Sequence, residues 1–197
     1  MAYIGKTPTP VPLTSSDITD GIISIADLAT TGTASSSTFL RGDGAFAEAG
    51  GGKLLQSVLV TTSTNQAISS ATYADLTGMT ANITPTKTSS TLLVQAYMNI
   101  ALTVGAGADE GFYSQILRDS TVINNSATSS GYGSLYYYTG DASNLHLVDV
   151  NIASDSSHNT TSQVTIKVQG KVPESADSIQ FNFNSLKKSY LLIQEIG

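Results

Sequence analysis

The sequence predicts an all-β protein, a sandwich or barrel of nine or ten short antiparallel strands. Two observations lead to this expectation. Residues 53–197 consist of short segments in which apolar and polar residues alternate, which is the period of a half-buried strand. Turn residues separate these segments at short intervals, and no convincing helical period occurs among them. The fold is therefore expected to be all-β after residue 53.

The chain changes character near residue 50. Residues 1–49 are rich in Pro, Ser and Thr, and residues 50–52 are three consecutive glycines. We therefore expect an extended N-terminal arm with a short helix (1–49), a glycine hinge (50–52) and a β domain (53–197). This plan suits attachment, with one end docking and the other presenting a surface.

The first part of the arm is expected to be extended. Pro8, Pro10 and Pro12 each fix φ and disfavour helix at the preceding residue, so residues 7–13 favour a polyproline-like conformation. The apolar side chains offered to a receiving protein are then Tyr3, Ile4, Val11 and Leu13. A disordered tail is the alternative.

A short amphipathic helix is expected next, where residues 15–20 supply several capping side chains. A one-sided apolar stripe follows at spacings of three and four residues: Ile18, Ile22, Ile25 and Leu28. Such a short helix is marginal alone, so the stripe needs a partner, either its own copies in a trimer or a receiving protein. Further on, residues 41–44 predict a tight turn between residues 39–40 and 45–46.

Alternation predicts which residues face the core of the β domain. The clearest strand is 91–103, and the other expected strands include 145–153, 163–169 and 178–184. The expected inward residues are Leu92, Val94, Ala96, Met98, Ile100 and Leu102; Val148, Val150 and Ile152; Val164, Ile166 and Val168; and Ile179, Phe181 and Phe183. Residues 71–76 and 79–84 are expected to be two separate strands, and Asp119 and Ser120 to form a hairpin turn.

Two strands are apolar on both faces, residues 54–60 and 190–193. Such a strand is typically covered twice. The domain core is one cover, and a second subunit would supply the other. A central strand buried within a monomer is the alternative.

Composition excludes several classes of protein. There is no cysteine, hence no disulfide or thiolate metal site. A net charge of −6 with scattered Lys and Arg disfavours nucleic acid as a partner. No segment approaches the roughly 20 apolar residues that cross a bilayer, and the N-terminus lacks the features of a signal peptide. We expect no nucleic acid and no membrane insertion.

Reaction chemistry is not visible in the sequence, which has no Gly-x-Ser-x-Gly elbow and no phosphate-binding loop. No cofactor is expected. Glycan hydrolysis remains a remote alternative, for which Asp109, Glu110, Asp141 and Asp155 are the acids to test. His158 lies in a polar loop and His146 on the face of Val148, with no third metal ligand at a telling spacing.

Ligand binding is better placed on polar loops and tyrosines, since aromatic rings stack on sugars and Tyr is enriched at interfaces. A core or subunit-interface role for some of the tyrosines is the alternative. The candidate receptor-contacting residues are Asp109, Glu110, Tyr132, Tyr136, Tyr138, Asp141, Asp155 and His158.

Both ends of the chain resemble a known family. Residues 1–6, with 11–21, resemble the N-terminal segment of tail fibre proteins of tailed bacteriophages. Residues 33–46 are similar to the segment that precedes the next domain in many such fibres, although Phe46 stands where Trp is usual. Residues 71–79, 116–120 and 191–197 resemble small jelly-roll tip domains related to the tumour-necrosis-factor and C1q fold.

The resemblance implies a jelly-roll β domain in a homotrimeric, non-enzymatic virion protein of the tail or baseplate. A tail or baseplate protein would receive the arm, with Pro8, Pro10 and Pro12 among the anchoring residues. The domain would then recognise a host-surface glycan. A capsid or tail decoration protein without receptor binding is the alternative.

Overall fold

The computed structural model describes residues 30–36, 38–48, 52–104, 109–126, 135–138, 143–173, 179–185 and 187–197, with backbone alone at 103–104, 109–110, 136–138 and 143–144. The expected polyproline segment and short helix, with all eleven anchoring residues from Tyr3 to Leu28, lie outside this range. By its internal contacts the chain divides into two compact units, Met1–Gly51 and Gly52–Gly197.

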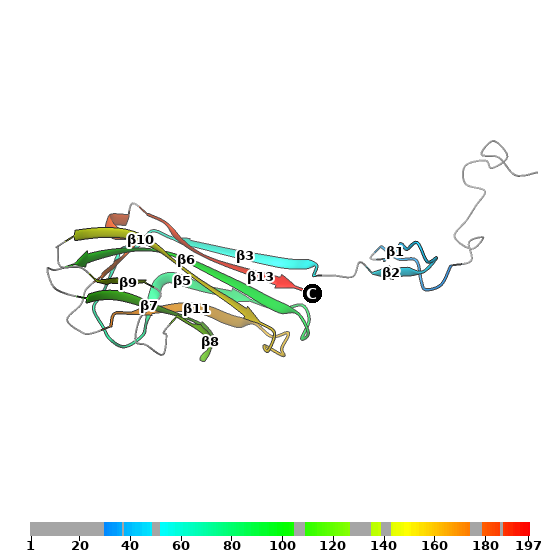
Figure 1. Ribbon diagram of the computed structural model, residues 1–197. Coiled ribbons are helices and arrows are strands. Elements are labelled where there is room, and N and C mark those ends of the chain that lie inside the picture. Colours follow the sequence, from blue (N-terminus) through cyan, green and yellow to red (C-terminus); the bar gives the residue numbers. More distant parts are fainter. Residues whose placement is uncertain are drawn as a thin grey trace, which may run out of the picture. The chain divides into compact units, whose positions relative to one another are not determined.

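The described part of the first unit is a hairpin of β1 (Thr38–Leu40) and β2 (Phe46–Glu48), shown in blue in Figure 1. The turn between them closes where the sequence predicted it. The amide of Gly44 donates to the carbonyl of Arg41 (3.0 Å), and the amide of Ala45 donates to the Asp43 carboxylate (3.1 Å). Thr31 adds an isolated parallel bridge to Ala45. The Arg41–Asp43 stretch is thus a hairpin turn.

The second unit contains eleven strands among its described residues, against the nine or ten expected. In chain order they are β3 (Leu54–Thr62), β4 (Gln66–Ile68), β5 (Ala74–Ile83), β6 (Thr91–Val104), β7 (Asp109–Arg118), β8 (Thr121–Asn125), β9 (Leu135–Tyr138), β10 (Ser143–Asp155), β11 (Val164–Lys171), β12 (Ile179–Phe181) and β13 (Ser189–Ile196). A short 3-10 turn, η3 (Phe183–Ser185), follows β12.

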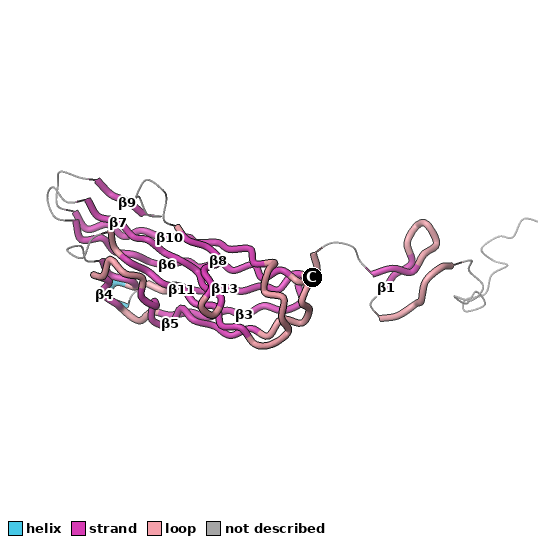
Figure 2. Tube along the Cα trace, turned by 90° about the horizontal axis from the view of Figure 1, so that it is seen from below, coloured by secondary structure: helices cyan, strands magenta, loops and turns pink. Residues whose placement is uncertain are grey.

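These strands form two antiparallel sheets packed as a sandwich (Figures 1 and 2). One sheet has the order β3-β13-β6-β10, with β4 and β12 continuing the rows of β3 and β13. The other has the order β5-β11-β7-β8, with β9 pairing the other end of β7. We count β3 with β4, and β12 with β13, as single rows and leave the short β9 aside. Numbered in chain order, the eight rows then have the order 1-8-3-6 in one sheet and 2-7-4-5 in the other. This is the connectivity of a jelly roll, so the predicted fold class is confirmed.

The core lies between the sheets, and most of the predicted inward residues are there. All six inward residues expected on β6 are at most 1% exposed, and Val164, Ile166 and Val168 of β11 are also buried. Ile179 and Phe181 of β12 are fully buried. Close packing is visible at Gly170, where an added Cβ would lie 2.5 Å from Cε2 of Phe112.

The predicted division of residues 71–84 into two strands is wrong, because β5 runs continuously from Ala74 to Ile83. Gly78 sits within it with a φ of +78°, and the register with β11 shifts between Lys167 and Gln169. The glycine therefore marks a bulge, which locally disturbs the ladder without ending the strand.

Two predicted inward sets need correction. Val148, Val150 and Ile152 of β10 face outward, with exposed fractions of 55%, 44% and 51%. The alternate residues Asp149 and Asn151 are buried instead. Phe183 also leaves the core, because β12 ends at Phe181 and η3 begins at Phe183.

The inward polar residues of β10 are buried because partners from the opposite sheet meet them. The Ser114 hydroxyl donates to the Asp149 carboxylate (2.9 Å), and the Asn151 amide donates to the same hydroxyl (2.9 Å). Asn124 of β8 in turn donates to the Asn151 side-chain oxygen (2.6 Å). A satisfied polar network can occupy a core position, since the cost of burial falls on unpaired groups.

Candidate functional site

An uncovered apolar surface lies on the outer side of the sheet β10-β6-β13-β3. Cross-strand register defines it, since residues paired across neighbouring strands share a face. One row runs Ile152, Gln95, Leu192, Leu59, and the next runs Val150, Tyr97, Tyr190, Thr61. We call the outward positions of residues 57–61, 93–99, 148–154 and 190–194 the open face.

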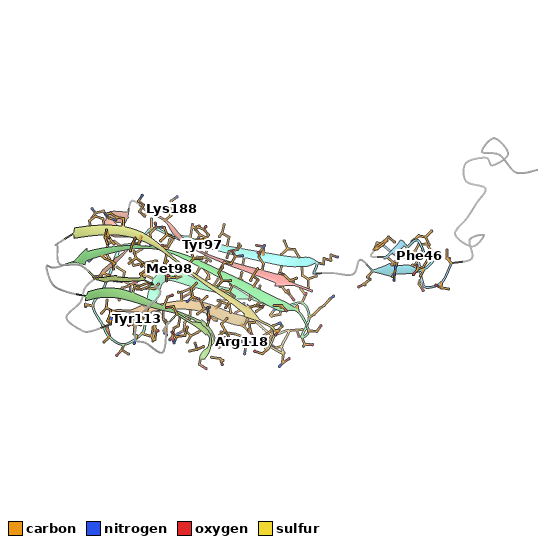
Figure 3. All side chains as sticks on the ribbon, in the orientation of Figure 1. Phe46, Tyr97, Met98, Tyr113, Arg118 and Lys188 are labelled. Carbon is orange, nitrogen blue, oxygen red and sulfur yellow. The ribbon has the colours of Figure 1, made fainter. Side chains whose placement is uncertain are left out.

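Large apolar side chains on the open face are well exposed. Leu59 is 60% exposed and Ile152 is 51% exposed, and they lie on the two opposite edge strands of the sheet. Tyr97 and Tyr190 stack between them, with ring centroids 4.4 Å apart (Figure 3 labels Tyr97). Scattered exposed apolar residues are normal, but a contiguous apolar patch indicates an interaction site.

The open face carries no formally charged residue. Its outward positions hold Ser, Thr, Leu, Val, Ile, Gln, Asn and Tyr, while Asp149, Asp155 and Glu195 point to the inside. Depletion of charge together with enrichment of tyrosine is typical of the centre of a protein–protein interface. For a chain of net charge −6, such a face removes a source of repulsion between copies.

A small hollow of about 110 Å³ adjoins the open face at one end of β10. Its lining includes Asn99, His146, Val148, Phe183 and Lys187, and the His146 and Phe183 rings lie 5.2 Å apart. His146 is exposed on the same side as Val148, as the alternation predicted. No carboxylate lines the hollow, so the acid pair of a glycosidase is not found there.

Four candidate receptor residues are brought together by the strand pairing. In the ladder between β7 and β9, Asp109 is paired with Tyr138, and Gly111 with Tyr136. Glu110 pairs with Tyr137 in the same ladder. The backbone thus places side by side acidic and tyrosine positions that are 27 or 29 residues apart in sequence. Tyr132 and Asp141 lie outside the described residues.

Asp155 lies instead at the opposite end of the sandwich, where it is 3% exposed and forms an ion pair with Arg118. Burial by itself would raise the pKa of Asp155, but hydrogen bonds from Ser157 and the Arg118 guanidinium outweigh it, so the pKa lies below its ordinary value. In this structure Asp155 ties β10 to β7 and orders the start of the following loop.

His158 lies in the same loop and is also buried. Its Nε2 is 2.9 Å from the carbonyl oxygen of Ser90, and its Nδ1 is 3.2 Å from that of Thr160. These contacts hold the loop after β10 against the turn before β6. The structure therefore gives both Asp155 and His158 internal partners, whereas receptor contact would need them at the surface.

Glu195 is a buried carboxylate that was not among the site residues predicted from the sequence. Its oxygens accept hydrogen bonds from the Ser90 hydroxyl (2.6 Å), the Gln56 amide (2.6 Å) and both the amide and hydroxyl of Thr86 (2.8 and 2.9 Å). Burial would raise the pKa of Glu195, yet these donors lower it to about 2. Alternation along β13 with Leu191 and Ile193 could have identified it as inward.

The Glu195 cluster is not arranged for nucleophilic catalysis. Ser90 Oγ is 2.6 Å from the Glu195 carboxylate but 3.4 Å from His158 Nε2, so the histidine does not bridge serine and acid as in a hydrolase triad. Ser90 is also only 1% exposed. Within the described residues, no group of three or more His, Cys, Asp or Glu side chains could hold a metal ion, and no helix could span a membrane.

No family model matches this sequence, and no curated protein matches it. Among solved structures, similar chains occur in infectious bursal disease virus. The VP2 subviral particle is 12% identical over 77% of this chain and 41% of that one, with a TM-score of 0.39. A D431N mutant VP2 in T=1 particles is 14% identical over 76% of this chain and 38% of that one, with a TM-score of 0.38. The structure of the Gx strain of the virus is 11% identical over 77% of this chain and 41% of that one, with a TM-score of 0.40.

This chain thus spans about two fifths of the length of the structures it matches.

Proposed function

We propose that this chain is a non-enzymatic structural protein of a virus particle, and that its jelly-roll domain assembles as a homotrimer. The subunits meet through the open face. The N-terminal arm, residues 1–49, anchors the trimer to a tail or baseplate protein, in keeping with the tail-fibre resemblance of residues 1–21 and 33–46.

The uncovered open face is the observation that supports this proposal most. Leu59 and Leu192 belong to the two strands that the sequence marks as apolar on both sides, and the fold covers only one side of each. Val150 and Ile152 of β10 extend the same surface across the whole sheet. Burying this apolar area between subunits would be favourable at about 25 cal/mol per Å².

Within this function, we favour host-glycan recognition at the end of the domain where β7 and β9 pair. Asp109 and Glu110 there lie beside Tyr137 and Tyr138 in the ladder. Carboxylates that accept hydrogen bonds from hydroxyls, next to aromatic rings, are a combination that suits sugars. The chain passes from its first unit into the domain at the other end, where Lys53 and Gly197 exchange backbone hydrogen bonds.

A decoration protein without receptor binding is the second candidate. It is favoured by the internal roles of Asp155 and His158, which leave the loop at 154–161 as a structural element. In this case the open face would join the domain to its neighbours, and the acid–tyrosine ladder would have no ligand.

Sedimentation of the full chain tests the assembly. The protein is expected to sediment as a trimer, and Ile152→Asp to sediment as a folded monomer because it buries a charge in the contact. Thr80→Asp is the matched control, since it adds the same charge to an exposed position on the other sheet. A monomeric wild-type chain, or an Ile152→Asp variant that remains trimeric, would contradict the proposal.

Binding to an array of bacterial surface polysaccharides separates the two candidates. The trimer is expected to bind a subset of glycans, and Tyr138→Ala to lose that binding without a change in sedimentation. If the trimer binds none of these glycans, the hypothesis of a decoration protein without receptor binding takes precedence. Binding that persists in Tyr138→Ala would move the glycan site away from the ladder of β7 and β9.

A further inference from the structure

The hairpin of the first unit has no core of its own. Among the described residues from Thr30 to Glu48, none is buried. Phe39 is 49% and Leu40 45% exposed, and Phe46, labelled in Figure 3, is only partly covered. A two-stranded hairpin is at best marginally stable in water, so this one requires a cover for its apolar side chains.

Both faces of the hairpin carry large or small apolar side chains, and they differ. The register pairs Leu40 with Phe46 and Phe39 with Ala47. Because paired residues share a face and successive residues alternate, Phe39 and Ala47 lie on one side. Leu40 and Phe46 lie on the other, followed by the pair Thr38 and Glu48 at the open end of the hairpin. A twofold dimer would bury the same face of both copies and leave the second face in water. A closed ring places one face of each copy against the other face of the next.

The hairpin and its tether are suited to contact between copies. Arg41 pairs with Asp43 (3.5 Å), which leaves Glu48 as the only other charged residue from 30 to 48, so the copies repel each other little. Only three residues, 49–51, separate Glu48 from the domain. Such a tether reaches about 14 Å at most, so assembly of the domains would raise the local concentration of hairpins to the millimolar range or above.

We infer that the hairpins of three copies pack in a ring, with the Leu40–Phe46 face of each against the Phe39–Ala47 face of the next. This inference rests on the proposed homotrimer and adds a second contact between its subunits. The hairpin acquires its core only in the trimer, and the three chains are thereby fastened on the N-terminal side of the jelly-roll domain.

Engineered cysteines joined by a thiol cross-linker in the full chain test the ring, because the natural sequence has no cysteine. In the double variant Leu40→Cys/Ala47→Cys, each chain carries one thiol on each face. Packed β layers lie about 10 Å apart, which is too far for most disulfides. A bis-maleimide with a spacer of about 10 Å matches this separation. It should link each chain to both neighbours and give a covalent trimer on a denaturing gel.

Three controls accompany this variant. Leu40→Cys and Ala47→Cys alone place a thiol on one face only, so neither should give a covalent trimer. Gly42→Cys/Ala47→Cys carries two thiols but moves one to the turn, where an added Cβ meets nothing within 4 Å. This variant should run largely as a single chain on the denaturing gel after the same cross-linking.

Two results would overturn the ring. If the double variant sediments as a trimer but yields monomers or covalent dimers on the gel, the hairpins are covered in another way, for example by residues 1–29, and the homotrimer itself stands. If the wild-type chain sediments as a monomer, the proposed assembly fails and the ring fails with it.

Discussion

The two faces of the sheet β10-β6-β13-β3 are both apolar, but the fold buries only one of them. Leu191 and Leu192 are neighbours in β13 and have the same chemistry. Leu191 is fully buried between the sheets, whereas Leu192 lies on the open face between Leu59 and Gln95. The same holds across the sheet for Val94 of β6 and Val150 of β10, which are 0% and 44% exposed.

This difference shows that the two faces of one strand contribute to different properties of the protein. Inner residues contribute to the stability of the single chain, because their apolar surface leaves water when the sandwich closes. Outer residues contribute nothing comparable until a second molecule covers them. Substitutions on the two faces should therefore affect different measurements: unfolding for the inner face and association for the outer face.

The largest effect is expected from the pair of leucines. Leu191→Ala should lower the free energy of unfolding by about 2–5 kcal/mol, since it leaves a cavity in the core. Leu192→Ala should lower it by about 1 kcal/mol or less while weakening the trimer. Urea unfolding at a protein concentration below the dissociation constant of the trimer gives the free energy of unfolding. Sedimentation gives the strength of the trimer. Equal losses of stability would mean that the single chain already covers the open face.

A smaller effect is expected at Glu195, the one carboxylate on the inner side of β13. Glu195→Gln should cost about 2 kcal/mol at neutral pH, because an amide replaces an ionic acceptor of several hydrogen bonds. The measurement is again urea unfolding. An unchanged midpoint would show that Ser90 and Thr86 find other acceptors.

The pH dependence of Glu195 has a defined sign. Its pKa is about 2 in the folded protein and 4.5 ordinarily, so the unfolded chain binds the proton first as the pH falls. The stabilisation is present above pH 4.5 and is lost between pH 4.5 and 2. The difference in stability between the natural chain and Glu195→Gln should therefore shrink over this range. A constant difference would contradict the carboxylate's role.

The smallest effect on unfolding is expected from Val150→Thr, the outer member of a pair of near-isosteric exchanges on the two faces. Val94→Thr buries a hydroxyl in the core and should cost about 1–3 kcal/mol. Val150→Thr makes the same exchange on the open face and should change unfolding by less than about 0.5 kcal/mol. Its effect should be seen only in a higher dissociation constant of the trimer. Unchanged association of Val150→Thr would place β10 outside the contact.

The fold class and most of the inner face could be predicted from residue patterns alone. Strict alternation from Leu92 to Leu102 and from Val164 to Val168 identified buried residues correctly, since both strands lie in the interior of their sheets. The turn at residues 41–44 was also predicted correctly from its glycines. Gly44 adopts a φ of +79° there, which glycine tolerates. Local chemistry and a period of two are sufficient for such features.

Pairing across the chain was not readable from the sequence. The adjacency of Asp109 and Tyr138 depends on register in the ladder of β7 and β9, and the burial of His158 depends on the turn that contributes Ser90. No local pattern encodes such contacts, because the partners lie far apart in sequence. The residues of the candidate site could therefore be predicted one by one, but not which of them lie next to each other in space.

The side of β10 that faces the core follows from its packing against the other sheet. Alternation shows that Val148, Val150 and Ile152 share one face and Asp149 and Asn151 the other, but it gives no direction. Ser114 and Asn124 satisfy the polar set inside the sandwich, so the apolar set is free to face outward. A sequence period fixes the two faces of a strand, whereas the groups packed opposite each face determine which one is buried.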